Sequence, residues 1–248
     1  MLEVRNLCKS FGGLQVTRDI SFALEPGERR VILGPNGTGK TTLFNLLVGT
    51  MTPSSGDILL DGRSVRGLSV AARARAGLSR SYQKNNLFEA LSIRENLLLA
   101  AAAGHGKADT ILRDSFRDGA VRETVAQVAE QVALTSMLDL PVRSASYGAR
   151  RQLEVGLALA TRPQILLMDE PTSGVGPTMI EGFHRLLHSL PRELTVLIIE
   201  HDMDLAFDVA DRITVLNFGE VVFEGTPEET HGNKVVRDIY LGDWQADA

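Results

Sequence analysis

The sequence has little cysteine and no long apolar run. Its one cysteine, Cys8, cannot form an internal disulfide, which fits a reducing compartment. The longest apolar run covers residues 97–103, far fewer than the ~20 residues that span a bilayer. The first residues also lack the apolar core of about 7–15 residues that marks a secretory signal. We therefore expect a soluble, cytosolic chain, which can still lie against a membrane protein.

Positive charge is also in deficit. Lysine and arginine together number 26 against 31 acidic residues, for a net charge of −5, which argues against electrostatic binding to nucleic acid. A small basic cluster comprises Arg73, Arg75 and Arg80, for which we expect a solvated face or a subunit contact. With 248 residues, 44% of them hydrophobic, the chain can form one large α/β domain or a core with subdomains.

What the sequence does contain is a phosphate-binding loop of the form G-x-x-x-x-G-K-[ST]. Its residues are Gly34, Pro35, Asn36, Gly37, Thr38, Gly39, Lys40 and Thr41, and Thr42 is expected to join them at the nucleotide. Residues 30–33 predict a buried strand before the loop, and residues 42–48 predict a helix after it. Glycines and a helix start present backbone N–H groups to an anion. Lys40 supplies charge for the β- and γ-phosphates, and the Thr41 hydroxyl can bind Mg²⁺. A chance glycine-rich turn is the alternative, which the strand–loop–helix context disfavours.

The second half of the chain predicts a parallel sheet. Apolar strands are expected at 165–168 and 195–199, with a helix at 179–190 between them, and strand–helix–strand order implies a sheet covered on both faces. Ligands of such sheets bind at the carboxyl ends of the strands. The residues just past strand ends, which one site could collect, are Gly34, Asp169 and His201.

Other segments predict different architecture. Turn signals within residues 1–33 indicate antiparallel strands that lead into the first core strand, and a further strand is expected at 57–60. The stretch 94–140 reads as helical, with an amphipathic helix over 121–132. Another helix is expected at 149–161.

Asp169 and Glu170 close a buried strand, as a Walker-B element does. Asp169 can hold Mg²⁺, directly or through water, and Glu170 can orient or deprotonate the attacking water. His201 could contact the γ-phosphate or that water. The alternative for Asp169 and Glu170 is a pair of solvated acids at the end of a strand. The alternative for His201 is a histidine with a purely structural role.

Together these motifs resemble those of the ATP-binding-cassette (ABC) ATPases. By this resemblance Phe11 stacks on adenine with Val16 beside it. Gln83 is similar to the Q-loop glutamine, which touches Mg²⁺, serves hydrolysis and faces the transporter's membrane subunit. The stretch Ser146-Tyr147-Gly148 resembles the signature motif, whose helix start faces the γ-phosphate held by a partner subunit. Lys40, Glu170 and His201 match the phosphate lysine, the catalytic glutamate and the switch histidine.

The resemblance implies an α/β fold: a P-loop NTPase core with a mostly parallel sheet, an N-terminal antiparallel β subdomain and a helical ABC subdomain. Residues 1–83 and 160–248 would form the core and residues 84–159 the helical part. It also implies an ATPase that uses ATP and Mg²⁺, pairs with a second ABC ATPase subunit, and couples to membrane permeases and indirectly to a substrate-binding protein. Such a subunit lies on the inner face of the cell membrane and binds no nucleic acid.

Three positions depart from the family pattern. Ala145 replaces the usual leucine and Ala149 the usual glutamine or glutamate of the signature motif, and Gly176 replaces an aspartate or asparagine that contacts the other subunit. Ala145 is expected to remove packing only. We expect weak ATPase activity from the isolated subunit; fast, cooperative turnover without membrane partners would contradict this.

The branch that the chain resembles most contains the ATP-binding subunits of branched-chain amino acid importers. The supporting stretches are Phe11-Gly12-Gly13-Leu14, Glu200-His201-Asp202-Met203, Gly225-Thr226-Pro227 and Tyr240-Leu241-Gly242. Relatives of this branch import urea, short amides and other amino or organic acids. Since the substrate does not touch the ATPase in this family, these residues do not identify it.

Two other function classes compete. A soluble ABC ATPase acting on DNA or ribosomes usually carries a coiled-coil insertion, two cassettes or a basic arm. A P-loop kinase or GTPase of another class is disfavoured by the signature segment and by Asp169-Glu170. His184 and His188 fit an exposed polar face of a helix better than a metal site. Cys8 is expected to be a small buried apolar residue, and residues 97–103 are expected to form a packed helix.

Overall fold

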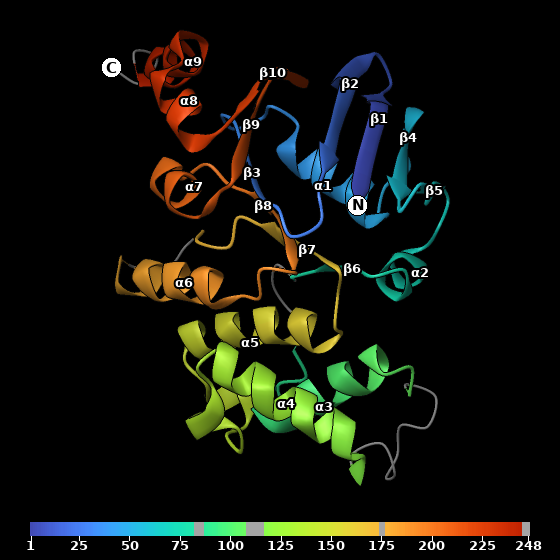
Figure 1. Ribbon diagram of the computed structural model, residues 1–248, viewed down its shortest axis with the longest axis vertical. Helices are drawn as coiled ribbons and strands as arrows, with labels where there is room; N and C mark the ends of the chain where they lie inside the picture. The colour runs from blue at the N-terminus through green and yellow to red at the C-terminus, as the bar shows by residue number, and fades with distance from the viewer. Residues whose placement is uncertain (82–86, 108–116, 174–176, 245–248) are drawn as a thin grey trace. The chain divides into compact units, whose positions relative to one another are not determined.

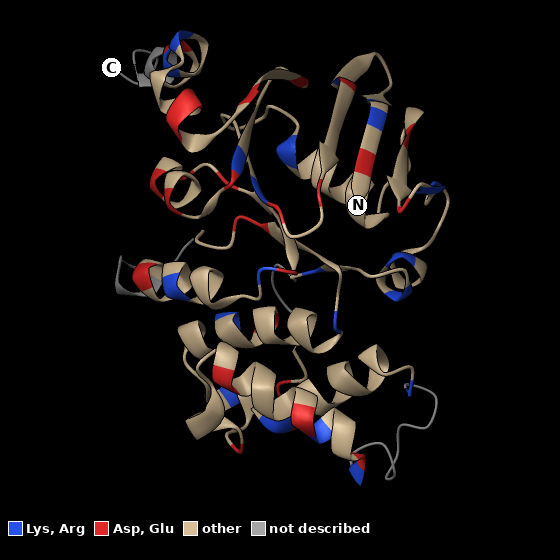
Figure 2. Cartoon of the chain, in the orientation of Figure 1, with Lys and Arg blue, Asp and Glu red and all other residues tan. Residues whose placement is uncertain are grey.

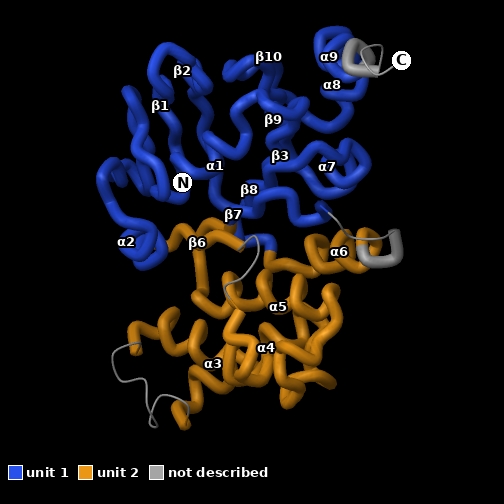
Figure 3. The backbone as a smooth tube through the Cα atoms, turned by 180° about the vertical axis from the view of Figure 1, so that it is seen from behind, with its two compact units in different colours: residues 1–76, 167–173, 192–248 blue, residues 77–166, 174–191 orange. Residues whose placement is uncertain are grey.

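The computed structural model describes residues 1–81, 87–107, 117–173 and 177–244, with the side chains of 177–179 and 241–244 left aside. The chain divides into two compact units, coloured separately in Figure 3. The first comprises residues 1–76, 167–173 and 192–248, and the second comprises residues 77–166 and 174–191. Two residues from the sequence analysis, Gln83 and Gly176, lie outside the described residues.

The first unit begins with an antiparallel sheet, as expected (Figure 1). Its strand order is β2-β1-β4-β5, and its strands are β1 (Leu2–Phe11), β2 (Leu14–Leu24), β4 (Ser55–Leu60) and β5 (Arg63–Ser64). The β1–β2 hairpin turns at Gly12, whose φ of 58° lies in the left-handed region that glycine adopts without strain. Alternating residues of β1, such as Leu2 and Val4, are buried, as expected of a sheet with one covered face.

A mostly parallel sheet forms the core of the first unit, which confirms the predicted fold class. Strand β3 (Arg29–Leu33) pairs in parallel with β8 (Thr195–Ile199) and with β9 (Arg212–Asn217), and β10 (Glu220–Gly225) pairs antiparallel with β9. Strand β7 (Ile165–Asp169) follows β8 in the order. Every residue of β3, β7 and β8 is buried, because a parallel sheet has both faces covered.

Side-chain caps fix where most helices of the first unit begin. The helices are α1 (Lys40–Val48), α2 (Val70–Arg75), α7 (Met203–Val209), α8 (Pro227–Gly232) and α9 (Lys234–Trp244). Ser69, Asp202 and Thr226 accept hydrogen bonds from the first-turn amides of α2, α7 and α8. Helix α1 begins two residues earlier than the sequence predicts.

Helices dominate the second unit. Besides β6 (Leu78–Arg80) it contains α3 (Ile93–Gly104), α4 (Gly119–Gln131), the 3₁₀ turns η3 (Thr135–Met137) and η4 (Val142–Ser144), α5 (Tyr147–Ala160) and α6 (Pro177–Ser189). The valine stripe of α4 is buried, and so are Leu97, Ala101 and Ala102 of α3, which confirms the packed helix expected there. Gly156 of α5 lets α3 approach, since a Cβ at this position would lie 3.3 Å from Leu97.

Two expectations about single side chains were wrong. Arg73 does not lie on a solvated face, since only 2% of its surface is exposed; its guanidinium donates to main-chain carbonyls of α1. Cys8 is half-buried rather than fully buried, and its Sγ accepts a hydrogen bond from the Asp19 amide. In the described parts of the chain, no helix combines the length and apolar character needed to cross a membrane.

Candidate functional site

The loop between β3 and α1 folds tightly because two of its glycines leave no room for a side chain. A Cβ on Gly34 would lie 2.4 Å from the carbonyl oxygen of Leu216, and a Cβ on Gly39 would lie 2.8 Å from that of Val16. Gly39 also adopts a φ of 100° immediately before α1, a conformation that other residues rarely take. The loop can therefore present its amides, with the unpaired N–H groups of the helix start, to an anion.

A cavity of about 280 Å³ lies in front of this helix start. It is lined by Val16, Asn36, Gly37, Glu170 and residues 39–42. The structure therefore brings the phosphate loop and the carboxylate after β7 to one cavity, although some 130 residues of sequence separate them. The cavity thus joins the loop after β3 to the residue after β7, whereas Asp169 and His201 are not among its lining residues.

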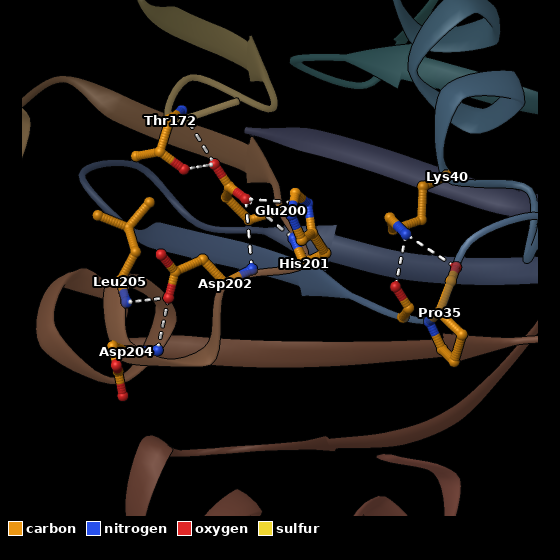
Figure 4. Close-up of polar contacts among 9 residues, drawn as sticks. Pro35, Lys40, Thr172, Glu200, His201, Asp202, Asp204 and Leu205 are labelled. Carbon is orange, nitrogen blue, oxygen red and sulfur yellow. Dashed lines mark hydrogen bonds and ion pairs between the residues drawn. The ribbon is translucent and has the colours of Figure 1, made fainter. Parts of the chain in front are cut away.

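Lys40 is buried beside this cavity, with 5% of its surface exposed. Its Nζ donates hydrogen bonds to the carbonyl oxygens of Gly34 and Pro35, the latter at 2.9 Å (Figure 4). Burial lowers the pKa of the Lys40 ammonium, and the carboxylates of Glu170, Asp169 and Glu200 act in the opposite direction. An ammonium has three N–H donors, so Lys40 can hold the loop and still offer a donor to a phosphate.

Glu170, the first residue after β7, adopts an unusual backbone conformation. Asp169 is the last residue of the strand and is 5% exposed, whereas Glu170 has a φ of 44°. A left-handed φ is uncommon for glutamate and costs about 1–3 kcal/mol, strain that proteins retain mainly at functional sites. The Glu170 amide donates to the carbonyl oxygen of Ile199 in β8 at 2.8 Å, which holds the turn in place.

His201 lies two residues after the end of β8, with 52% of its side chain exposed. Its backbone is fixed on both sides. The His201 amide donates to the Glu200 carboxylate at 2.9 Å, and the next residue, Asp202, caps α7 by accepting from the amides of Asp204 and Leu205 (Figure 4). The imidazole is thus an exposed group on a rigid support.

Oxygen donors near the loop fit a divalent cation. The Thr41 hydroxyl is on the first turn of α1, and Asp169 ends β7. Hydroxyl, carboxylate and phosphate oxygens are the ligands that Mg²⁺ takes in nucleotide sites. The donor set therefore suits magnesium; the third predicted ligand, Gln83, lies outside the described residues.

The aromatic residue predicted to stack on adenine is accessible. Phe11 ends β1 and is 48% exposed, and the ammonium of Lys9 lies 5.2 Å from its ring centroid. Val16 lines the phosphate cavity, but Phe11 does not. Phe11 thus offers a ring face to a ligand without forming the cavity wall.

The signature residues lie in the second unit, at the start of α5. Ser146 is the N-cap, and its hydroxyl oxygen accepts from the Ala149 amide at 3.2 Å, which is why the helix begins at Tyr147 rather than at residue 149. Tyr147 is 54% exposed. With Gly148 and Ala149 these residues line a cavity of about 430 Å³ that also borders α6. The N-terminal dipole of α5 and the free hydroxyl hydrogen of Ser146 suit an anion.

Comparison with known proteins decides the family. Residues 17–173 match the family model described as ABC transporter. The chain belongs to this family. As an ABC ATPase it binds and hydrolyses ATP, which agrees with the loop, the cavity and the carboxylates described above.

Individual ABC relatives match over the whole chain. The branched-chain amino acid transport ATP-binding protein BraF of Pseudomonas aeruginosa is 37% identical to this chain. The branched-chain amino acid transport ATP-binding protein LivG of Escherichia coli K12 is 35% identical, and each comparison covers 98% of both chains. The crystal structure of an ATP-binding cassette of an ABC transporter in its ADP conformation superimposes with a TM-score of 0.82 at 26% identity, covering 98% of both chains.

Sequence reasoning about this ABC ATPase missed Glu200. Glu200 lies in a stretch typical of the importer branch, but the sequence pattern there indicates no role for it. The structure finds its carboxylate fully buried between two motifs. The available signal was the position of this acid between an apolar strand and a histidine. An acid that is buried there needs hydrogen-bond donors to compensate its charge, which indicates contacts with other segments.

Proposed function

We propose that the chain is the ATP-hydrolysing, energy-coupling subunit of an ABC importer for branched-chain amino acids or related small polar solutes. The observation that best supports ATP hydrolysis is that Lys40, Thr41 and Glu170 line one cavity. The substrate class rests on the similarity to BraF and LivG, two branched-chain amino acid transport ATP-binding proteins that the chain matches over 98% of their lengths.

Within this proposal the residues of the first unit have distinct tasks. The loop amides and Lys40 neutralise charge that moves onto the γ-phosphate oxygens, the main contribution to phosphoryl transfer. Glu170 orients or deprotonates the attacking water. His201 contacts the γ-phosphate or that water, and Phe11, with Val16, receives the adenine. Thr41 and Asp169, together with Gln83, would hold Mg²⁺, which would supply further neutralisation of the phosphates.

Completion of the site requires a second chain in this proposal. Ser146, Tyr147 and Gly148 would meet the γ-phosphate bound by a partner ABC ATPase, identical or similar, so that two chains enclose two ATP molecules. Closure would move the permease subunits through the region of Gln83, and hydrolysis would reopen the pair. The subunit would then lie on the inner face of the membrane, with a helical subdomain at about 84–159 and an indirect link to a substrate-binding protein.

Charge supports a protein partner over nucleic acid. The net charge is −5, and basic and acidic residues are interspersed along the described elements of each unit (Figure 2). A nucleic-acid ATPase would be expected to gather its basic residues in a stripe or patch.

Transport measurements test the proposal. In the source organism, deletion of the gene should abolish high-affinity uptake of labelled leucine, isoleucine or valine, or of a related small solute. The wild-type gene should restore uptake, and the Glu170→Gln variant should not. Normal uptake of all these solutes in the deletion strain, together with ATPase activity stimulated by ribosomes or DNA, would favour the competing class.

A further inference from the structure

The carboxylate of Glu200 is fully buried, with an exposed fraction of 0%. Oε1 accepts from the amide and the hydroxyl of Thr172, at 3.2 and 2.6 Å. Oε2 accepts from the amides of His201 and Asp202, at 2.9 and 3.3 Å (Figure 4). Its own amide donates to Ile32 of β3 at 3.1 Å. Backbone donors therefore supply most of the compensation for the buried charge.

These bonds join two separate segments of the chain. Thr172 lies two residues after Glu170, on the turn that leaves β7, and His201 lies one residue after Glu200, at the end of β8. Both segments carry a group expected at the γ-phosphate. One buried side chain thus fixes the backbone beside each of them.

The position requires an acceptor at both side-chain oxygens. Both oxygens face backbone N–H groups, so each must accept. An amide in place of the carboxylate has a single acceptor oxygen, and its NH₂ would have to face an N–H donor on one side. A buried N–H without an acceptor is unfavourable, so glutamine of the same size and shape cannot reproduce the arrangement.

We propose that Glu200 is a positioning residue for ATP hydrolysis: its carboxylate holds the turn that carries Glu170 and the support of His201 in one fixed relation. Since Oε2 also lies 3.6 Å from Nδ1 of His201, the carboxylate limits where the imidazole can point when the ring is protonated. The inference rests on the roles proposed above for Glu170 and His201. It assigns Glu200 no contact with the nucleotide.

The test compares Glu200→Gln with Glu224→Gln in the full chain. Glu224 is the control because its carboxylate likewise accepts hydrogen bonds at both oxygens within the first unit, from Arg30 and Arg212, but lies outside the candidate site. Measurements are ATP affinity, melting temperature, and single-turnover hydrolysis with protein in excess. For Glu200→Gln we expect ATP affinity within about threefold of wild type and hydrolysis at least about tenfold slower. Glu224→Gln should hydrolyse ATP at the wild-type rate.

A double variant separates positioning from a general structural role. If Glu200 acts through His201, Glu200→Gln should slow His201→Ala by much less than it slows wild type, because groups that act as a unit are not additive. Thr172→Val, which removes only the 2.6 Å bond, provides a milder variant should Glu200→Gln not fold, and should slow hydrolysis several-fold. Wild-type rates in the folded variants, or full additivity with His201→Ala, would overturn the inference.

The same experiments distinguish failure of the proposed function from failure of the positioning role of Glu200. If wild type and Glu170→Gln hydrolyse ATP equally, the proposed function of the site is wrong. If Glu170→Gln is inactive and Glu200→Gln matches wild type, only the positioning role is wrong.

Discussion

Nη1 of Arg73 lies 2.6 Å from the carbonyl oxygen of Leu47, in the last turn of the helix that follows the phosphate loop. The same nitrogen donates to Leu46 at 2.7 Å. The last carbonyls of a helix have no partner within it and carry the negative end of its dipole. A buried guanidinium therefore completes the C-terminus of α1, and burial lowers its pKa from the ordinary arginine value without removing its charge under physiological conditions.

Arg73→Met should lower the free energy of unfolding by about 2–4 kcal/mol, because it leaves two buried carbonyls without a charged donor. Arg75→Met on the exposed face of the same helix is the control and should change it by less than about 0.5 kcal/mol. Urea unfolding of both variants measures the difference. Equal stability of the two would show that the contact with α1 contributes nothing.

Lys40→Ala should weaken ATP binding by at least about tenfold, because it removes a charge-assisted donor to the phosphates and the bonds to Gly34 and Pro35. Lys234→Ala, on an exposed position of α9, removes the same charge away from the cavity and should bind like wild type. Calorimetric titration with ATP gives both affinities. An unchanged affinity for Lys40→Ala would rule against the loop as the nucleotide site.

Glu170→Gln should keep ATP affinity, reduce hydrolysis by at least about 10²-fold, and accumulate an ATP-bound dimer, since the amide cannot accept a proton from water. Glu193→Gln, at an exposed position outside the site, is the control. Phosphate release measures turnover and size-exclusion chromatography with ATP measures the dimer. Hydrolysis at the wild-type rate would exclude Glu170 as the group that prepares the water.

The parallel core and the phosphate loop could be predicted because both follow from short-range patterns. Strand β8 has the bounds that its apolar run predicts, and the helix after the loop ends at Gly49, which adopts a φ of 89°. The order of strands and helices then brings residues after different strands to one edge. The cavity shared by Lys40 and Glu170 is a consequence of that rule.

Burial of charged residues could not be predicted in the same way. Arg73 sits in a locally basic stretch, which looks solvated in sequence, and only the tertiary fold brings it to carbonyls about 26 residues earlier. The hydrogen bonds of Glu200 depend likewise on a turn that is distant in sequence, where the amide and hydroxyl of Thr172 donate to its carboxylate. Hydrogen bonds between residues far apart in sequence produce no periodic pattern. The sequence therefore shows that these charged residues exist, but it does not predict which residues they bind.

Ala149 stands where the signature motif usually has glutamine or glutamate, and this difference leads to a prediction about protein stability. Ala149 is 4% exposed, yet it lines the cavity of about 430 Å³ at the start of α5. A glutamine side chain at this position can extend into the cavity, so Ala149→Gln should change the free energy of unfolding by less than about 1 kcal/mol. Ala158→Gln is the control: that alanine is 3% exposed in the same helix but is not among the residues that line this cavity, and the larger polar side chain should destabilise the protein by about 1–3 kcal/mol.

If the helix start of α5 faces the ATP of a partner chain, the added amide supplies a further polar contact there. Ala149→Gln should then strengthen ATP-dependent association of the Glu170→Gln variant by several-fold, since one well-formed interfacial hydrogen bond contributes about 0.5–1.5 kcal/mol. Analytical ultracentrifugation with and without ATP measures this association. A stable Ala149→Gln variant whose association is unchanged or weakened would mean that residue 149 does not face the partner nucleotide, and that the alanine there leaves the completed site intact.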